Sequence, residues 1–507
     1  MLEEERKYQV DTGFTVPDLP VPPGGRVVAA SPVTLTATYL DTADLRLARS
    51  GVSLRHRKGD REPWTVKLPA DLPGVRHEIS RPGKPGRPPA DLVELVTAFT
   101  RGAELRPAVV VRTVRQAYEV RDAGDRVLAE LADDAVAVMD GKRIGKRFRE
   151  IEVERKDGDG TLLDRIEAVL LEAGARRGEF VAKHIRALDA AATADPDLVP
   201  AGDLDKKPTA GDVVTNAIRR NVGRLLAHDP LVRLRAPVGD DDTAVHQMRV
   251  ACRRLRSDLR TFRPLVEKDW AGGLRDELKW LADALGAARD AEVLRARLRV
   301  TAEADPLKPP DQAAIAQMDT ALEARHEAAL DALDDALRSD RYLALVEALV
   351  AATRAPELTR QAERPAKDVL PRLVARPWRR LVAGRNGATG AADLDPAAPD
   401  EQWHAVRING KKARYAAEAV APVLGGGAAK LAKSLSRLQN VLGEHQDAAV
   451  AGQTWLSLAA ADPRDHSLAV TAGRLFERER TAIRTARAEF APAWRRASRR
   501  KRTDWLG

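Results

Sequence analysis

Hydrophobic and polar residues alternate with a period of two over most of the first 190 residues. The alternation is clear in short segments such as TATYLD, VSLRHRK, WTVKL and EIEVERK, which breaks such as PVPPGG and LPADLPG separate. Alternation bounded by Gly, Pro and Asp is typical of antiparallel β-strands. A few helical segments intervene, notably at 89–102 and 160–174. The N-terminal part is therefore predicted to be an α+β domain built on antiparallel strands.

The pattern changes after residue 211. Residues 194–211 are rich in Pro, Asp, Gly and Lys, which predicts a linker. From 212 to 502 the chain is rich in Ala, Leu and Arg, and segments such as LKWLADALGAARDAEVLRARL have the periodicity of amphipathic helices. We therefore expect a β-rich domain over 1–193, a linker over 194–211 and an all-α domain over 212–502.

The helical part repeats a motif of basic residues. In AVHQMRVACRRLRSDLRTF and EQWHAVRINGKKARYAAEAV, basic side chains follow a histidine at offsets of 3, 7, 8 and 10. The two sets are His246, Arg249, Arg253, Arg254 and Arg256, and His404, Arg407, Lys411, Lys412 and Arg414. An aspartate follows each histidine, Asp290 after 44 positions and Asp447 after 43. This ordered repetition predicts two pseudo-symmetric helical bundles, 212–355 and 365–502.

Charged residues on the predicted strands share faces, because side chains at i, i+2 and i+4 point to one side of a strand. The residues in such positions are Glu3, Glu5 and Lys7, Arg55 and Arg57, Lys67, Arg76 and Glu78, and Glu150, Glu152 and Glu154. One charged strand face is normally solvated. Acids gathered on the terminal strands and bases on the strands between them favour instead a closed barrel with a charged interior.

Such an interior predicts a chemistry. Clustered carboxylates can bind Mg²⁺ or Mn²⁺ through oxygen ligands, and arginine and lysine side chains can bind phosphate. Acids for a metal together with bases for phosphate indicate phosphoryl transfer that is assisted mainly by charge neutralisation.

The ordered set ExExK (Glu3, Glu5, Lys7), YLDT, LRHR, WTVKL, RHE, EIEVE and a late AKH resembles the CYTH domain, a family of triphosphate tunnel metalloenzymes. The resemblance covers residues 1–190. It implies an eight-stranded antiparallel tunnel that binds inorganic or organic triphosphates with Mg²⁺ or Mn²⁺. An attacking water, activated by the metal or by a nearby carboxylate, would cleave the triphosphate.

The resemblance also implies roles for individual residues. The metal ligands, direct or through water, would be Glu3, Glu5, Glu150, Glu152 and Glu154. The phosphate-binding residues would be Lys7, Arg55, Arg57, Lys67, Arg76, Arg112 and Lys183. Catalysis would involve Glu3, Glu5, Lys7 and Lys67, with Asp133 and Asp134 as additional candidate acids on the metal side.

The two histidine-containing segments predict helices with an uncompensated basic stripe. Steps of three and four residues place His246, Arg249 and Arg253 on one face, beside an apolar face that packs into the bundle. Like charges this close repel each other, so we expect an anionic partner rather than a solvated surface. Binding of single-stranded nucleic acid normally adds aromatic stacking platforms, and aromatic residues make up only 4% of the chain. A polymer of phosphate therefore fits better than nucleic acid.

The segment VHQMRVACRRLRSDLRTF, together with LGAARD and LGEHQD, resembles the CHAD domain, the histidine-bearing helical domain that often follows CYTH. The resemblance spans 212–500 and implies two helical half-bundles around a basic groove that binds inorganic polyphosphate. All ten basic residues of the repeated motif carry over as polyphosphate-binding residues. Lys411 and Lys412 replace two arginines of the first copy, which keeps the charge but loses bidentate contact. We assign Asp290 and Asp447 to helix pairing.

Composition narrows the functional classes. Lys and Arg number 84 and Asp and Glu 75, and the net charge of +9 fits surfaces that attract polyanions. Cys252 is the only cysteine, which excludes intrachain disulfides and Cys-rich zinc sites and fits a reducing compartment. No apolar run is long enough for a membrane span, and the start MLEEERK does not resemble a signal peptide. We expect a cytoplasmic protein, and association with polyphosphate granules stays open.

The basic C-terminal run APAWRRASRRKRTDWLG predicts a final helix. Its arginines form either a solvated surface or an extra contact to a polyanion.

Three functional hypotheses follow. The first is a metal-dependent tri/polyphosphatase joined to a polyphosphate-binding bundle. The second is a non-catalytic polyphosphate-binding protein. The third is a protein that acts on an organic triphosphate, of the thiamine triphosphatase or adenylate cyclase type, or that associates with nucleic acid. No feature that recognises a base or a thiazole ring was found, which favours inorganic tri- or polyphosphate.

Overall fold

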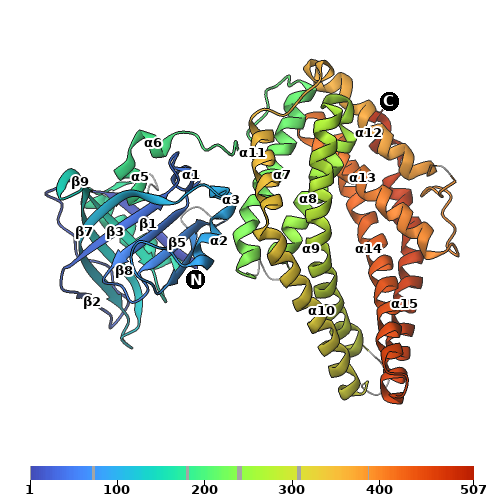
Figure 1. Ribbon diagram of the computed structural model, residues 1–507, viewed down its shortest axis with the longest axis horizontal. Coiled ribbons are helices and arrows are strands. Elements are labelled where there is room, and N and C mark those ends of the chain that lie inside the picture. Colours follow the sequence, from blue (N-terminus) through green and yellow to red (C-terminus); the bar gives the residue numbers. More distant parts are fainter. Residues whose placement is uncertain are drawn as a thin grey trace. The chain divides into compact units, whose positions relative to one another are not determined.

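The computed structural model describes residues 2–70, 75–178, 182–236, 242–304, 310–385 and 387–506, without the side chains of Leu2 and Glu3. The chain divides into two compact units, Met1–Asp197 and Leu198–Gly507 (Figure 1). The first unit contains the strands and the second is all-helical, which confirms the predicted fold classes.

The first unit is a closed antiparallel β-barrel. Its eight strands, in their order around the barrel, are β1 (Leu2–Gln9), β6 (Val75–Arg81), β5 (Trp64–Pro69), β4 (Ser53–Lys58), β3 (Val33–Asp41), β7 (Arg106–Arg121), β8 (Val127–Asp140) and β9 (Arg143–Arg155). Pairing of β9 with β1 closes the barrel. Two short strands lie at its margin, β2 (Arg26–Ala29) beside β7 and β10 (Arg176–Arg177) beside β1.

The alternation of apolar and charged residues decides which face of each strand points inward. On β9, Ile151 and Val153 point outward and are fully buried under α4 (Gly160–Glu172), together with Leu163 and Ile166 of that helix. Glu150, Glu152 and Glu154 therefore share the opposite, inner face. The remaining helices of this unit are short: α1 (Arg46–Arg49), α2 (Ala90–Leu95), α3 (Thr97–Thr100), α5 (Lys183–Leu188) and α6 (Ala190–Thr193).

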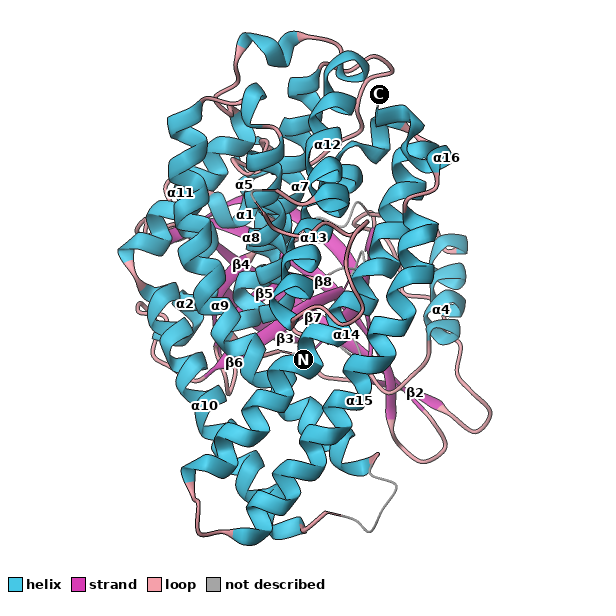
Figure 2. Ribbon diagram, turned by 90° about the vertical axis from the view of Figure 1, so that its right-hand side faces the viewer, coloured by secondary structure: helices cyan, strands magenta, loops and turns pink. Residues whose placement is uncertain are grey.

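The second unit consists of two similar series of helices. The first series is α7 (Ala210–Arg233), α8 (Ala244–Thr261), α9 (Lys268–Glu303), α10 (Gln312–Arg338) and α11 (Asp340–Arg354). The second is α12 (Ala366–Ala383), α13 (Asp400–Leu424), α14 (Gly426–Ala461) and α15 (His466–Ala497), followed by α16 (Arg500–Thr503). In both series the helix with the histidine motif, α8 or α13, packs against a 36-residue helix, α9 or α14. Figure 2 shows these four helices side by side.

The packing of the two series follows from their apolar stripes. On α8, Met248, Cys252 and Leu255 are buried, which leaves the basic stripe on the other side of the helix. Further along, Leu298 of α9, Trp455 of α14 and Leu475 of α15 belong to one core that also includes α10. No described helix has both the length and the apolar character that a membrane crossing requires.

Candidate functional site

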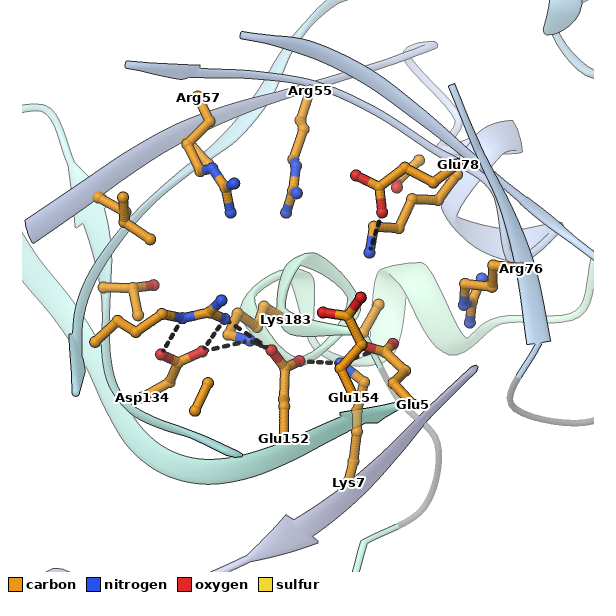
Figure 3. Close-up of a pocket in the computed structure, with 18 of the residues that line it drawn as sticks. Glu5, Lys7, Arg55, Arg57, Arg76, Glu78, Asp134, Glu152, Glu154 and Lys183 are labelled. Carbon is orange, nitrogen blue, oxygen red and sulfur yellow. Dashed lines mark hydrogen bonds and ion pairs between the residues drawn. The ribbon is translucent and has the colours of Figure 1, made fainter. Parts of the chain in front are cut away.

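The barrel interior is a cavity of about 710 Å³ whose wall carries both acidic and basic side chains (Figure 3). Every strand of the closed barrel contributes at least one lining residue. The charged side chains that line it include Glu5, Lys7, Arg55, Arg57, Lys67, Arg76, Glu78, Arg115, Glu130, Asp134, Glu152 and Glu154, together with Lys183 from α5.

Lys183 lies among three carboxylates on the acidic side of the cavity. Its ammonium nitrogen is 2.7 Å from Glu152, 2.8 Å from Asp134 and 3.0 Å from Glu150. Arg115 binds Asp134 through two nitrogens and donates to Glu152 at 2.9 Å. Burial alone would lower the pKa of Lys183, but the surrounding carboxylates raise it above its usual value. This lysine is therefore a charged ammonium.

Lys7 connects the same acids to the N-terminal strand. Its ammonium group contacts Glu152 and lies 3.4 Å from Glu5. Burial opposes ionisation of Glu152, but the charges of Lys183, Lys7 and Arg115 outweigh it and hold the pKa of that carboxyl well below its usual value. Glu152 is thus ionised, and its charge is partly neutralised by these cations.

The basic side lies across the cavity. Figure 3 shows Arg55 and Arg57 pointing from their strand toward Glu152 and Glu154. Arg55 is close to the Tyr39 hydroxyl at 3.5 Å, and its buried Nε has no partner in the described part of the chain. Lys67 pairs with Glu78 at 2.9 Å, and Arg76 donates to the Gly51 carbonyl at 2.8 Å. These four cations form a wall that can bind anionic oxygens.

Most of the predicted tunnel residues meet in this cavity. It brings together Glu5, Lys7, Arg55, Arg57, Lys67, Arg76, Glu152, Glu154 and Lys183. Glu150 is buried beside them and pairs with Lys183 and with Arg186 at 2.6 Å. Glu3 lies on β1, but its side chain is outside the described residues. Asp134 points inward, whereas Asp133 pairs with Arg149 and does not line the cavity.

Arg112 does not line this cavity, which corrects the placement implied by the resemblance. Along β7 the inward residues are Val111, Thr113 and Arg115, so Arg112 has the opposite parity and is exposed. Arg115, which faces Asp134 across the β7–β8 pairing, is the inward arginine. Sequence reasoning missed it.

His184 is a second residue that sequence reasoning missed. It follows Lys183 on α5 and stacks on Tyr39 with ring centres 4.7 Å apart. Burial and the nearby charges of Arg76 and Arg55 lower its pKa to about 3, so the ring is neutral. The stack covers one face of Tyr39 and leaves the cavity with little free aromatic surface.

The donor set of the acidic side fits a hard divalent cation in kind, because all its members are carboxylate oxygens. Glu5 and Glu154 are paired across β1 and β9. Among the residues whose side chains are described, however, no three acidic, histidine or cysteine groups form a ready metal site. The reason is that Lys183, Arg115 and Lys7 are placed between the carboxylates. A metal ion would therefore have to replace some of the contacts that these three cations make with the carboxylates.

The helical unit has a groove of about 780 Å³ between α8, α9, α13 and α14. Of the repeated motif, His246, Arg249, Arg253, Arg256, His404, Arg407, Lys411 and Lys412 line it. Arg260 extends the stripe, and Arg275, Arg289, Arg297 and Arg325 also line the groove. These last four were missed, because they lie outside the repeated histidine motif. In the described part of the groove eleven lysines and arginines face two aspartates.

Arg254 and Arg414 do not line the groove, although the repeat includes them. Both bind Glu418, Arg254 at 2.8 Å and Arg414 at 2.6 Å. Asp290 and Asp447 lie at equivalent places in the two copies, with Arg249 2.9 Å from Asp290 and Arg407 3.8 Å from Asp447. Asp290 and Asp447 thus orient one arginine in each half.

Burial, together with repulsion between neighbouring cations, lowers the pKa of several groove residues. Burial, and then the charges of Arg253 and Arg407, lower the pKa of Lys411 to about 6. Burial and Arg289 lower the pKa of His246. The buried Nε atoms of Arg275 and Arg407 have no partner in the described structure. An anion in the groove would relieve this repulsion and satisfy these donors.

Comparison with known proteins assigns both units. Family models match a CYTH domain at residues 1–186 and a CHAD domain at residues 216–456. An uncharacterised protein of Mycobacterium tuberculosis, Rv2226, is 32% identical over 520 residues, which cover 98% of this chain and 96% of that protein. Two solved structures are also similar. PptA from Streptomyces chartreusis is 25% identical with a TM-score of 0.45, over 57% of this chain and 99% of that chain. The CHAD domain from the plant Ricinus communis is 24% identical with a TM-score of 0.43, over 57% and 96%.

Proposed function

Because this chain belongs to the proteins in which a CHAD domain follows a CYTH domain, we propose that it hydrolyses inorganic triphosphate or polyphosphate in the barrel and binds polyphosphate in the groove. Both families are associated with phosphate-containing substrates, and CYTH tunnel domains are generally metal-dependent. The observation that carries the proposal is the wall of Arg55, Arg57, Lys67 and Arg76, which faces a wall of carboxylates inside one cavity of the barrel.

The two walls have different tasks in this proposal. The basic wall binds the terminal phosphates, with Arg55 and Arg57 able to give two-nitrogen contacts to phosphate oxygens. Glu5, Glu152 and Glu154, with Glu3, would hold Mg²⁺ or Mn²⁺, which would neutralise charge on the triphosphate. Lys183 and Lys7 keep Glu152 ionised at neutral pH. A carboxylate of this wall accepts the proton of the attacking water.

The groove supports polyphosphate rather than nucleic acid as the second ligand. Its lining has eleven lysines and arginines but a single aromatic residue among the described positions, Tyr415. Single-stranded nucleic acids are normally held by base stacking on aromatic side chains as well as by charge. A chain of phosphates needs only the charge.

One observation favours a second candidate function, that of a binding protein without hydrolytic activity. Lys183 and Arg115 already neutralise Asp134 and Glu152, which leaves fewer free carboxylates for a metal. The tunnel would then be a second phosphate-binding site. The organic triphosphate alternative has less support, because His184 covers one face of Tyr39 and leaves little free aromatic surface for a base.

The test is phosphate release from tripolyphosphate and from long-chain polyphosphate with Mg²⁺ or Mn²⁺. Wild type is compared with Glu5→Gln/Glu154→Gln and with Arg253→Ala/Lys411→Ala. Glu4→Gln, on the other face of the same strand, is the control. Hydrolysis abolished by the first pair and weakened by the second only for long chains supports the enzyme. The alternative result is that wild type releases no phosphate but binds the polymer, and that Arg253→Ala/Lys411→Ala abolishes this binding. It would favour the function of a binding protein without hydrolytic activity.

A further inference from the structure

A second basic surface lies at the C-terminal end of the helical unit. It is formed by the segments 369–385, 426–443 and 490–503, which we call the C-terminal basic track. Together these segments contain fourteen lysines and arginines and no acidic residue. All but Arg380 and Arg502 of the fourteen are exposed.

Within the described part of the chain, carboxylates leave nearly all cations of the track unpaired. Among the described residues, Arg500 is the only one of the fourteen in an ion pair with a carboxylate, at 3.4 Å from Asp504. Burial and the charges of Arg499 and Arg496 lower the pKa of Arg502, which shows how closely these arginines lie. The surface therefore attracts anions strongly.

Aromatic contacts hold the three segments together. Trp378 of α12 stacks on Trp494 of α15 with ring centres 5.7 Å apart. Trp505 packs against Gly427 of α14, where a Cβ atom would lie only 2.8 Å from the indole ring. Figures 1 and 2 both show the C-terminus beside α12. The track is thus one continuous surface built from separate parts of the sequence.

The track begins where the groove ends. Arg380 is on α12, which packs against α13 and also contacts α8, the two helices that carry the repeated basic motif of the groove. After burial and nearer arginines, its charge also contributes to lowering the pKa of two groove residues, Lys412 and Arg260. On α12 the arginines at 372, 376, 379 and 380 recur at helical spacing on the side away from buried Leu373 and Val374. No described acid lies within this stretch of α12.

We propose that the C-terminal basic track is a second polyphosphate-binding surface, onto which a long chain continues when it leaves the groove past Arg380. This inference rests on the proposed binding of polyphosphate in the groove. Continuity with the groove is the reason to choose the same polymer as the ligand. The two tryptophans at the track stack on each other and are half-buried, so they do not offer the free platforms that nucleic acid bases require.

The experiment compares the affinity of the full chain for tripolyphosphate and for long-chain polyphosphate at several salt concentrations. The track variant is Arg379→Gln/Arg496→Gln/Arg499→Gln. The control variant, Arg299→Gln/Arg480→Gln/Arg484→Gln, removes the same charge from exposed positions on α9 and α15. The groove variant is Arg253→Ala/Lys411→Ala. The barrel is identical in all of them, so any difference reports on the helical unit.

We expect the track variant to bind long-chain polyphosphate about tenfold more weakly and tripolyphosphate as wild type does. The slope of log affinity against log salt should fall by about 2, since each lost phosphate contact contributes about 0.7. The control should bind both ligands like wild type.

Three results would overturn the proposal. The track variant could match the control on long chains, or lose affinity for both chain lengths equally. It could also lose affinity for single-stranded DNA or RNA while keeping polyphosphate, which would assign the surface to nucleic acid. Failure of the proposed function looks different: the groove variant would then bind long chains as well as wild type does, or wild type would not bind them at all.

Discussion

Lys183 shows at the residue scale how a buried cation holds a site together. Its ammonium is the shared partner of Asp134, Glu150 and Glu152, two of which are almost completely buried. In Lys183→Met these acids would face one another without their common counter-charge. We expect the N-terminal unit to lose about 3–5 kcal/mol of unfolding free energy.

The measurement is hydrogen–deuterium exchange of the barrel strands at increasing denaturant, which reports on the N-terminal unit by itself. Lys58→Met is the matched control, because Lys58 is exposed at the end of β4. Equal stability of the two variants would show that the carboxylates do not depend on Lys183.

The lowered pKa of Lys411 predicts how stability and polyphosphate affinity depend on pH. Its pKa is lowered from 10.5 to about 6 in the free groove, so the unfolded chain binds more protons at this residue between these values. Its contribution therefore makes the folded state less stable as pH falls through that window. A bound polyanion favours the ammonium form, so affinity should rise as pH falls from about 8 toward 6 and level off below it.

Titration of wild type with polyphosphate at pH 6, 7 and 8 checks this dependence. Lys411→Arg is the control, since an arginine is always charged, and its affinity should change less over the same range. Equal pH dependence of the two proteins would rule out Lys411 as the titrating group. A change that appears only toward pH 6 would instead point to His246, whose pKa is also lowered.

At the scale of elements, a cluster of ion pairs joins α9, α14 and α15, and its contribution to the free energy of unfolding can be measured. Arg297 of α9 binds Glu479 of α15 at 2.8 Å and Glu444 of α14 at 2.8 Å. Glu479 is buried and also accepts from Thr301 and Trp455. Arg297→Met leaves this acid without a cation, and we expect a loss of about 3–5 kcal/mol. Glu479→Gln leaves no buried charge and should lose less, about 1–3 kcal/mol.

Denaturant unfolding of the helical unit distinguishes these variants. Arg299→Met, on the same helix but 61% exposed, is the control. If Arg297→Met loses no more unfolding free energy than Glu479→Gln does, this cluster of ion pairs stabilises the fold through packing rather than through charge.

The inward face of strand β9 could be predicted from the sequence, because its apolar and its charged residues both recur at every second position. Apolar Ile151 and Val153 alternate with three glutamates, so only one assignment of faces is consistent with a core. The inward face of strand β7 could not be predicted in this way. Val109, Val110 and Val111 are consecutive apolar residues, so no alternation shows which of them point into the barrel. Pairing with distant strands sets that register, so the sequence offered no check on Arg112, which the resemblance implied, against Arg115.

The basic stripes on the helices likewise could be predicted from the sequence only in part. Spacing of three and four residues correctly gave most of the groove lining on α8 and α13. It could not give the direction of Arg254, because its partner Glu418 is more than 160 residues away in the sequence. Arg414 pairs with the same glutamate at i+4, so this contact was a local signal that the sequence did contain.

At the scale of the whole molecule, the joining of two units makes a prediction about tethering. A polymer held by the groove raises the local concentration of chain ends near the barrel if both act on the same molecule. Insertion of about twenty Gly and Ser residues after Leu198, where the two units meet in the sequence, should dilute this effect. Phosphate release from sub-saturating long-chain polyphosphate should fall about threefold or more.

Release from tripolyphosphate should be unchanged by the insertion, because a short substrate does not use the groove. The same insertion combined with Arg253→Ala/Lys411→Ala should have no further effect on long chains. Long-chain hydrolysis that does not respond to the insertion would mean that the two units act independently.

Cys252 has a consequence of another kind. It is the only cysteine, lies fully buried in α8, and its thiol pKa is raised to about 12 by burial. An alkylating reagent can therefore reach it only when α8 separates from its neighbours. The chain therefore carries its own reporter of local unfolding of α8, the helix that bears Arg253. The rate of labelling, with and without polyphosphate, measures how far the ligand stabilises α8 against this opening.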